Sequence, residues 1–298
     1  MSKVRFFLRN VVKNSSHPRR FFRNVIAGAI CLAGVTVFAG CEKDKLDENV
    51  VVESISLDKT TLTIAIGESQ TLVATTVPAN ATVTWISSNA NAVVENGKVT
   101  GKAEGTVTIT AKAGDKTATC EVTVRGALIN GVVWALRNVD AAGTFASTHE
   151  SAGKFYQWNG KIAYGSAEWS HIPPTGAEWT KENDPSPEGW RVPTIVQMNK
   201  LLEVSKVTQA WTTQNGVNGF KFTDKANGAS IFLPAVGYVM HDGNFIISDV
   251  GVRGFYYTAS MADIMNNFVY GMYFSEVAPS IDEYGYGYYG QSIRSVLE

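Results

Sequence analysis

From residue 51 to residue 124, short runs of β-branched residues alternate with turn-forming residues. Residues 106–110 and 120–124 alternate strictly between apolar and polar side chains, which places one face of each strand in a core and the other in water. Asn96-Gly97 predicts a tight hairpin turn, because both turn residues need positive φ. The pattern predicts strands at 54–57, 61–66, 69–77, 82–87, 93–95, 98–100, 105–111 and 116–124. So many short strands indicate an all-β sandwich over residues 51–125.

Four stretches of this segment carry a family likeness: SISLDKTTLTIAIGESQTL, VTWISSN, GKVTGKAEGTVTITAKAG and TATCEVTV. Together they resemble the bacterial immunoglobulin-like domain of group 2. The resemblance implies an immunoglobulin-like sandwich in which Trp85 fills the core and Cys120 is buried on the last strand, where a thiol behaves as a small hydrophobe. It also implies a spacer or adhesion module on a bacterial surface, without catalysis.

The first forty residues have the order of a secretory signal peptide. Seven Lys and Arg residues and no acidic residue are followed by an apolar run at 25–38 and by two small residues, Ala39 and Gly40. The run has 14 residues, and a helix needs roughly 20 to cross a bilayer, which disfavours a permanent transmembrane anchor. Residues 1–40 are therefore predicted to be removed on export.

The cysteine that follows this run stands in the string VFAGC. This string resembles the lipobox of bacterial lipoproteins, although Phe38 stands where that family prefers Leu. The resemblance implies cleavage before Cys41, acylation of its thiol with chains such as palmitate, and a lipidated tether at 41–50. Acidic residues at 42–49 are similar to lipoprotein surface-export signals, so the expected location is the outer membrane, facing the cell surface. A plain secretory peptide is the alternative.

Charge and cysteine content limit the partners of the exported chain. Without residues 1–40 the chain keeps 258 residues and its formal net charge falls from −1 to −8, because the leader holds seven of the 26 basic residues and none of the 27 acidic ones. Nucleic acid requires a basic footprint and is therefore excluded as a main partner. Cys120 is the one remaining thiol, so we expect neither an internal disulfide nor a thiolate metal centre.

Composition changes after Arg125-Gly126, where aromatic residues and glycines become frequent. Six of the seven tryptophans follow this point. Thr194 is a candidate N-cap, and apolar residues at helical spacing from Ile195 predict one helix, extending as far as Val204. Strands are predicted at 132–138, 219–223, 230–234, 255–260, 267–274 and 292–296. We therefore expect a second, α+β domain with long loops over residues 127–298.

Seven separate motifs occur along this second segment: GVVWALRNV, GKFYQWNG, PSPEGWRVPT, NGFKF, IFLPAVGY, GFYYTAS and SIRSV. In this order they resemble the Fibrobacter succinogenes major paralogous domain, which is similar in fold to C-type lectins and to the formylglycine-generating enzyme. The resemblance implies a C-type-lectin-like fold. From the residues themselves we expect Trp134 and Trp190 to fill the core, and Arg191, which stands between apolar residues, to pair with a carboxylate or carbonyls. Many family members carry a cysteine pair where this chain has Ser186 and Ser295, so we expect these serines to lie close together.

The chain offers no assembled catalytic or metal-ligating motif. His149, His171 and His241 have no ligand spacing, and the calcium-binding motifs of C-type lectins are absent. We therefore expect no catalytic residues, no metal and no cofactor. Three loop carboxylates, Glu178, Asp184 and Glu188, leave a glycan-degrading enzyme open as an alternative.

The best binding candidate is the aromatic segment EYGYGYYG at 283–290. A tyrosine offers a flat apolar face with a polar tip, which suits recognition of glycans and proteins, although the rings could instead pack inward. Trp169 and Trp179, in a Pro-rich loop, are secondary candidates. We expect a surface lipoprotein that acts in glycan or protein binding or adhesion, with a structural subunit of a surface fibre as a further alternative. The tyrosines concerned are Tyr284, Tyr286, Tyr288 and Tyr289.

Overall fold

The computed structural model describes residues 51–166, 169, 176–240, 246–263 and 267–298. The predicted leader, Cys41 and the tether lie outside these residues, as do His171 and His241. The side chains of Asp263, Glu283 and Tyr284 are likewise outside the described part.

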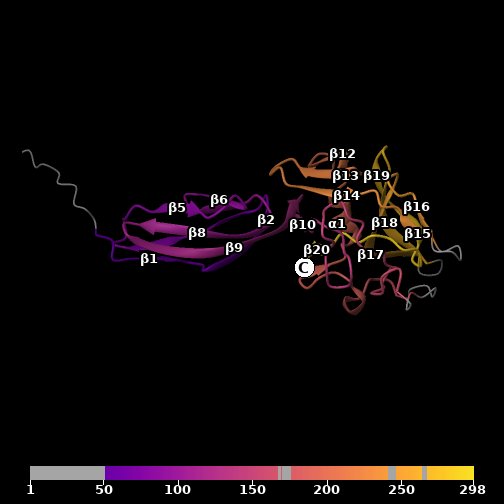
Figure 1. Cartoon of the computed structure of the whole chain (residues 1–298), viewed down its shortest axis with the longest axis horizontal. Coiled ribbons are helices and arrows are strands. Elements are labelled where there is room, and N and C mark those ends of the chain that lie inside the picture. The colour runs from indigo at the N-terminus through magenta and orange to yellow at the C-terminus, as the bar shows by residue number, and fades with distance from the viewer. Residues whose placement is uncertain (1–50, 167–168, 170–175, 241–245, 264–266) are drawn as a thin grey trace, which may run out of the picture. The chain divides into compact units, whose positions relative to one another are not determined.

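The first part of the described chain consists entirely of strands and turns (Figure 1). The long hairpin β8–β9 forms its centre; β5 pairs with β8, and β2 runs parallel to β9. Asn96 and Gly97 have φ of 49° and 82° and join β6 to β7, so the predicted hairpin turn is confirmed. The strands are β1 (Ser54–Leu57), β2 (Thr61–Ile66), β3 (Ser69–Thr71), β4 (Ala74–Val77), β5 (Thr84–Ser87), β6 (Ala92–Glu95), β7 (Lys98–Gly101), β8 (Gly105–Ala113) and β9 (Lys116–Ile129).

The single strand predicted at 69–77 is wrong, because the chain leaves the ladder at Leu72 and Val73. Leu72 is buried, and its N–H donates to the carbonyl of Gly97 at 2.9 Å. β3 therefore pairs with β7, whereas β4 pairs with β1.

The core of this part follows the predicted alternation. Val107, Ile109, Cys120 and Val122 are buried together on the inward faces of β8 and β9, and Trp85 packs against them while remaining partly exposed. Burial raises the pKa of the Cys120 thiol. Cys120 is thus a core residue, as expected.

Strand β9 continues past residue 125 without a break. Its first half pairs with β2 and β8, and its last three residues pair with β10 (Val132–Trp134). Gly126 has φ of 67°, and a Cβ there would lie 2.7 Å from the carbonyl oxygen of Trp134. The position where composition changes is therefore an ordered bulge between β2 and β9, and the two-domain division remains a prediction.

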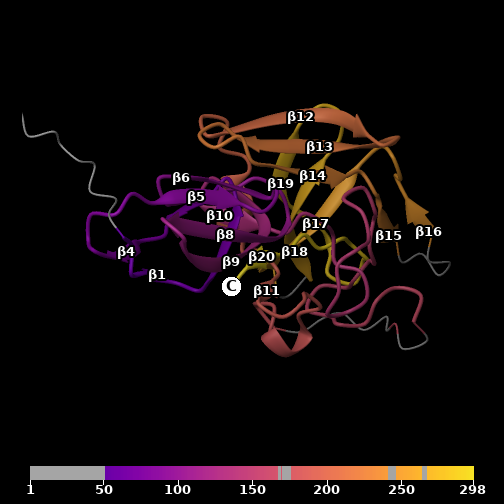
Figure 2. The ribbon, with the colours of Figure 1, turned by 60° about the vertical axis from the view of Figure 1, so that its left-hand side comes forward.

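The second part is also mostly strands. Sheets β12–β13–β14 and β17–β18–β19 share one apolar core, in which Phe220, Ile231 and Phe274 are buried (Figure 2). The predicted α+β character is reduced to one six-residue helix and one short 3₁₀ turn among the described residues. The elements are η1 (Lys181–Asn183), β11 (Trp190–Arg191), α1 (Ile195–Lys200), β12 (Val207–Gln214), β13 (Val217–Asp224), β14 (Ser230–Pro234), β15 (Tyr238–Met240), β16 (Ile246–Ser248), β17 (Gly254–Asp263), β18 (Phe268–Phe274), β19 (Pro279–Tyr286) and β20 (Val296–Leu297).

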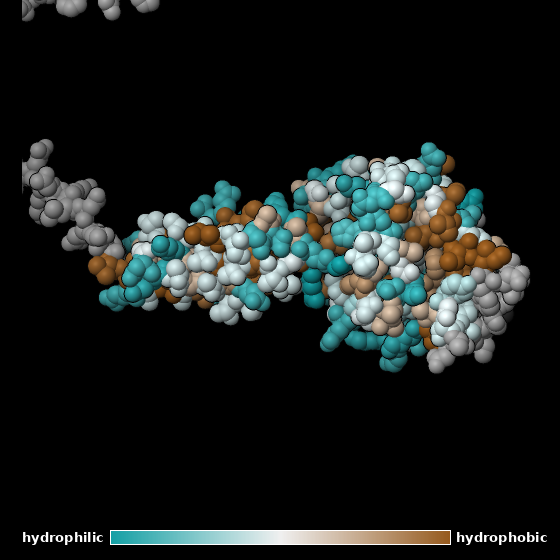
Figure 3. Space-filling view, in the orientation of Figure 1, coloured by the Kyte–Doolittle hydropathy of each residue, from teal (hydrophilic) through white to brown (hydrophobic). Residues whose placement is uncertain are grey.

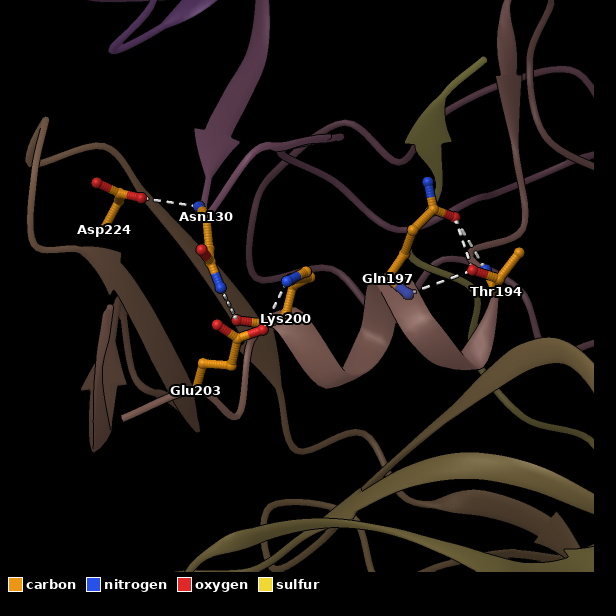
Figure 4. A network of polar contacts seen from close by, with 6 residues as sticks. All are labelled: Asn130, Thr194, Gln197, Lys200, Glu203 and Asp224. Carbon is orange, nitrogen blue, oxygen red and sulfur yellow. Dashed lines mark hydrogen bonds and ion pairs between the residues drawn. The ribbon is translucent and has the colours of Figure 1, made fainter. Parts of the chain in front are cut away.

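Helix α1 begins where the sequence predicted. The Thr194 hydroxyl accepts from the Gln197 N–H, and the Gln197 side chain accepts from the Thr194 N–H, which completes a capping box (Figure 4). The helix ends at Lys200, where the carbonyl accepts from Asn130 Nδ2 at 3.1 Å. The expected extension to Val204 is wrong, and that side chain is 67% exposed.

Four further expectations concern two tryptophans, Arg191 and a pair of serines. Trp134 and Trp190 are buried, as expected. Arg191 donates to the carbonyl of Val192 at 3.1 Å, so its partner is a carbonyl. Ser186 and Ser295 share a hydrogen bond of 2.7 Å between their hydroxyls, which confirms that they lie close together.

Candidate functional site

The tyrosine segment forms the end of β19 and the turn that follows it. Tyr286 stacks on Phe268 with a centroid distance of 4.9 Å and on Tyr288 at 4.9 Å, and it meets Tyr289 edge-on at 5.6 Å. The Tyr286, Tyr288 and Tyr289 side chains are all partly exposed. Three of the four predicted tyrosines therefore form one cluster, and the side chain of Tyr284 lies outside the described part.

The cluster continues across residues that are distant in sequence. Tyr289 packs on Tyr238 at 5.6 Å, Tyr238 on Phe255 at 4.6 Å, and Phe255 on Tyr273 at 5.2 Å. The guanidinium of Arg253 lies 5.9 Å from the Tyr273 ring centroid. All of these rings except Phe255 are partly exposed. We call this continuous row the aromatic strip: Phe268, Tyr286, Tyr288, Tyr289, Tyr238, Phe255 and Tyr273.

Backbone contacts hold the strip in place. The carbonyl of Tyr289 accepts from the buried Tyr257 hydroxyl at 2.7 Å, and the carbonyl of Tyr288 accepts from Gln157 Nε2 at 3.1 Å. Burial, followed by the neighbouring tyrosines, raises the pKa of Tyr288 and Tyr289. Their phenols are therefore neutral at physiological pH and serve as hydrogen-bond donors and acceptors.

Neither secondary tryptophan belongs to the aromatic strip. Trp179 is buried between Trp158 and Tyr257, and its indole N–H donates to the carbonyl of Asn183 at 3.0 Å. Trp169 is partly exposed and meets Tyr164 edge-on at 5.5 Å. Its indole nitrogen is buried and has no hydrogen-bond partner within the described residues.

An apolar surface that the sequence analysis missed lies on and after hairpin β15–β16. Ile246, Ile247, Val250 and Val252 are 42–64% exposed, and Figure 3 shows apolar side chains gathered over this hairpin. Four aliphatic residues within seven positions were the available signal.

The three loop carboxylates named above line one cavity of about 520 Å³. Asp184 accepts the N–H groups of Ser186 and Val192, both at 2.8 Å, one on each carboxylate oxygen. Lys181 pairs with Glu298 at 3.1 Å on the rim. Asp184 thus organises the loop, which leaves Glu178 and Glu188 as the exposed carboxylates of the original three.

No group of three or more His, Cys, Asp or Glu side chains suited to a metal occurs in the described ranges. The one described histidine, His149, is exposed, and partial burial, followed by the charge of Arg294, lowers its pKa. Helices long and apolar enough to span a membrane are also absent from that part of the chain.

Residues 51–124 match the family model of the bacterial Ig-like domain, group 2. A virion protein of Serratia phage KSP90, described as Ig-like, is 48% identical over 83 residues, which cover 25% of this chain and 32% of the phage protein. The chain thus spans about a third of the length of that curated relative. Residues 51–124 therefore form a bacterial immunoglobulin-like domain of group 2.

Two solved structures match this chain with low TM-scores. Domains 4 and 5 of the S-layer protein SbsC are 30% identical, with 25% of this chain and 46% of that chain covered and a TM-score of 0.22. A DUF4784 family protein from Bacteroides caccae is 11% identical, with 78% and 52% covered and a TM-score of 0.18.

Proposed function

We propose that this chain is a lipoprotein anchored through Cys41 in the outer membrane, with residues 51–125 as a spacer and residues 127–298 as a glycan-binding domain facing the cell surface. The VFAGC string after the apolar run supports the anchor. The Ig-like domain supports a non-enzymatic surface or structural module. A C-type-lectin-like fold for residues 127–298 is supported by the seven motifs and by the contact between Ser186 and Ser295.

The observation that carries the binding proposal is the aromatic strip. Sugar rings present apolar C–H faces and polar hydroxyl edges, and tyrosine rings with neutral phenols complement both. The rings lie on β15, β17, β18 and β19 or in the turn after β19, so the platform is already ordered before a ligand arrives. Preorganised rings lose little conformational entropy on binding.

A glycan array followed by calorimetry with the chain from Asn49 tests this proposal. Tyr288→Ala should weaken binding of the best glycan roughly tenfold or more, since it removes a central ring. Tyr288→Phe keeps the ring and should retain most of the affinity. Equal loss in both variants would indicate recognition of the hydroxyl and not of the ring. If no glycan on the array binds and the aromatic strip instead captures a protein partner, the glycan proposal is wrong and the ligand is a protein.

Lipid anchoring is tested separately by metabolic labelling with a palmitate analogue. We expect label on the wild type and none on Cys41→Ala, which should leave the membrane fraction, because acyl chains provide the attachment. An unlabelled wild-type chain that retains residues 1–40 would contradict the anchor.

A glycan-degrading activity is the second candidate, because Glu178 and Glu188 line the same cavity. Glycoside hydrolysis uses a pair of carboxyl groups. Release of reducing ends from array-positive glycans by the wild type, abolished in Glu188→Gln, would favour the enzyme over the binding protein. The fibre-subunit alternative remains a prediction.

A further inference from the structure

The cavity around Trp190 is a second feature able to hold a ligand, independent of the aromatic strip. Its volume of about 520 Å³ lies in the range of small-molecule sites, roughly 300–1,000 Å³. The loop between Glu178 and Thr194 forms most of the wall, and Ala259 and Ser260 of β17 close one side. The apolar part of the lining consists of the partly exposed Pro187 and Ala259 and the small exposed portions of Trp179 and Trp190, which are 9% and 8% exposed.

Much of the polar lining is already committed to holding the wall. Asp184 accepts two backbone N–H groups, and Lys181 pairs with Glu298. The Thr194 hydroxyl belongs to the capping box of α1. Asp184 and Thr194 therefore hold the backbone of the wall, whereas Lys181 and Glu298 neutralise each other at its exposed rim.

Three charged side chains in the lining remain available to a ligand. Glu178 and Glu188 make no side-chain hydrogen bond or ion pair to any described residue, and both residues are exposed. Arg191 is partly buried, and one nitrogen of its guanidinium donates a hydrogen bond to the carbonyl of Val192. The remaining guanidinium donors suit pairs of oxygen acceptors, as found in vicinal hydroxyls.

The balance of these groups defines the complementary ligand. Two uncommitted carboxylates against one guanidinium favour a cationic ligand, because hydrogen bonds to an ionised carboxylate are stronger than neutral ones. The apolar part of the lining favours a ring with apolar faces, and the guanidinium favours hydroxyls on that ring. A protonated amino sugar combines all three properties.

We propose that this cavity binds an amino sugar, with Glu178 and Glu188 receiving the ammonium group, Arg191 receiving ring hydroxyls and the two tryptophans bordering the ring. The site requires neither a metal nor the aromatic strip. It would give the chain a second binding position, selective for sugars whose amine is free.

Isothermal titration of the chain from Asn49 with glucosamine, glucose and N-acetylglucosamine tests the proposal. We expect saturable binding of glucosamine and at least about tenfold weaker binding of the two neutral sugars, since a charge-assisted hydrogen bond is lost. Glu178→Gln and Glu188→Gln should each weaken glucosamine binding by about tenfold. Glu182→Gln, on the exposed turn η1 of the same loop and outside the cavity lining, is the matched control and should bind as the wild type.

Three results would overturn the proposal: no saturable binding of glucosamine, equal binding of glucose, or unchanged binding in both glutamine variants. If butylamine binds as tightly as glucosamine, the site recognises the amine alone and the proposed recognition of a sugar ring is wrong. Tyr288→Ala should leave the affinity for glucosamine unchanged. The cavity proposal can therefore fail while glycan binding by the aromatic strip is retained, and the reverse.

Discussion

At the scale of single residues, Arg294 organises the core of the second part. It is fully buried, and its guanidinium makes five hydrogen bonds, to the side-chain oxygen of Asn138 and to the carbonyls of Ala135, Leu136 and Phe232. Burial lowers the pKa of Arg294 to about 10. Arginine presents five donors in a planar fork, and no other side chain can occupy all of these acceptors at once.

Arg294→Lys should therefore destabilise the chain by about 3 kcal/mol, because lysine keeps the charge but leaves buried acceptors unpaired. Urea unfolding followed by tryptophan fluorescence measures the change. Arg253→Lys is the control: Arg253 is half-exposed and pairs with Asp249 at 3.3 Å, so its loss should cost less than about 1 kcal/mol. Equal effects of the two substitutions would contradict the role given to Arg294.

Asp58 provides a pH-dependent contribution in the Ig-like domain. Its carboxylate accepts the N–H of Val73 at 2.8 Å and lies beside Lys59, and these contacts lower its pKa below the ordinary value of 3.8. A lowered carboxyl pKa stabilises the fold above that value and loses this effect as the pH falls through the folded pKa.

Asp58→Asn should therefore lower the free energy of unfolding at pH 7, and its difference from the wild type should shrink as the pH falls below 3.8. Chemical unfolding at several pH values measures both curves. If the difference in unfolding free energy between the two proteins stays constant with pH, the effect comes from side-chain packing and not from the charge of Asp58.

At the scale of elements, the sequence predicted strands best where one face is buried and the other exposed. β1 and β2 have the predicted bounds, and β8 exceeds its prediction by two residues. β12 was missed, although Asn215-Gly216 has φ of 48° and 82° and repeats the hairpin signal of Asn96-Gly97. Conversely, the strand predicted at 292–296 is reduced to Val296–Leu297 at the chain end.

The failure at 292–296 has a tertiary cause. Ser292, Arg294 and Ser295 are polar yet fully buried, and Arg294 and Ser295 find partners more than 60 residues away. Local periodicity cannot predict such partners. The aromatic strip could be predicted only in part for the same reason. The tyrosines at 286–289 are adjacent in sequence, but Tyr238 and Tyr273 join them through packing between strands.

The contact between Ser186 and Ser295 ties the loop after η1 to the segment before β20. Because the hydroxyls are 2.7 Å apart, cysteines at both positions should form a disulfide. Ser186→Cys with Ser295→Cys should oxidise spontaneously and stabilise the chain by about 2–4 kcal/mol, since the closed loop is long. Thiol titration and urea unfolding with and without reductant measure this. Ser295→Cys alone is the control, and a double variant that remains fully reduced in air would contradict the geometry.

At the scale of the whole molecule, β9 decides how residues on either side of position 125 are connected. A flexible linker would need unpaired backbone, whereas β9 is hydrogen-bonded along its course and passes from partners β2 and β8 to partner β10. The Arg125 guanidinium lies 5.9 Å from the Trp190 ring centroid. A spacer joined in this way would transmit force through a paired strand and not through a loose chain.

Limited trypsin digestion tests this connection, because Arg125 is a cleavage site within β9. We expect native chain to be cut first at exposed lysines such as Lys181, whose side chain is 81% exposed, and to remain uncut after Arg125 until it unfolds. Mass spectrometry of early fragments identifies the sites. A fragment ending at Arg125 among the first products would mean that the strand opens there. Trp190→Ala, which removes the ring beneath the guanidinium, should make that cut appear earlier than in the wild type.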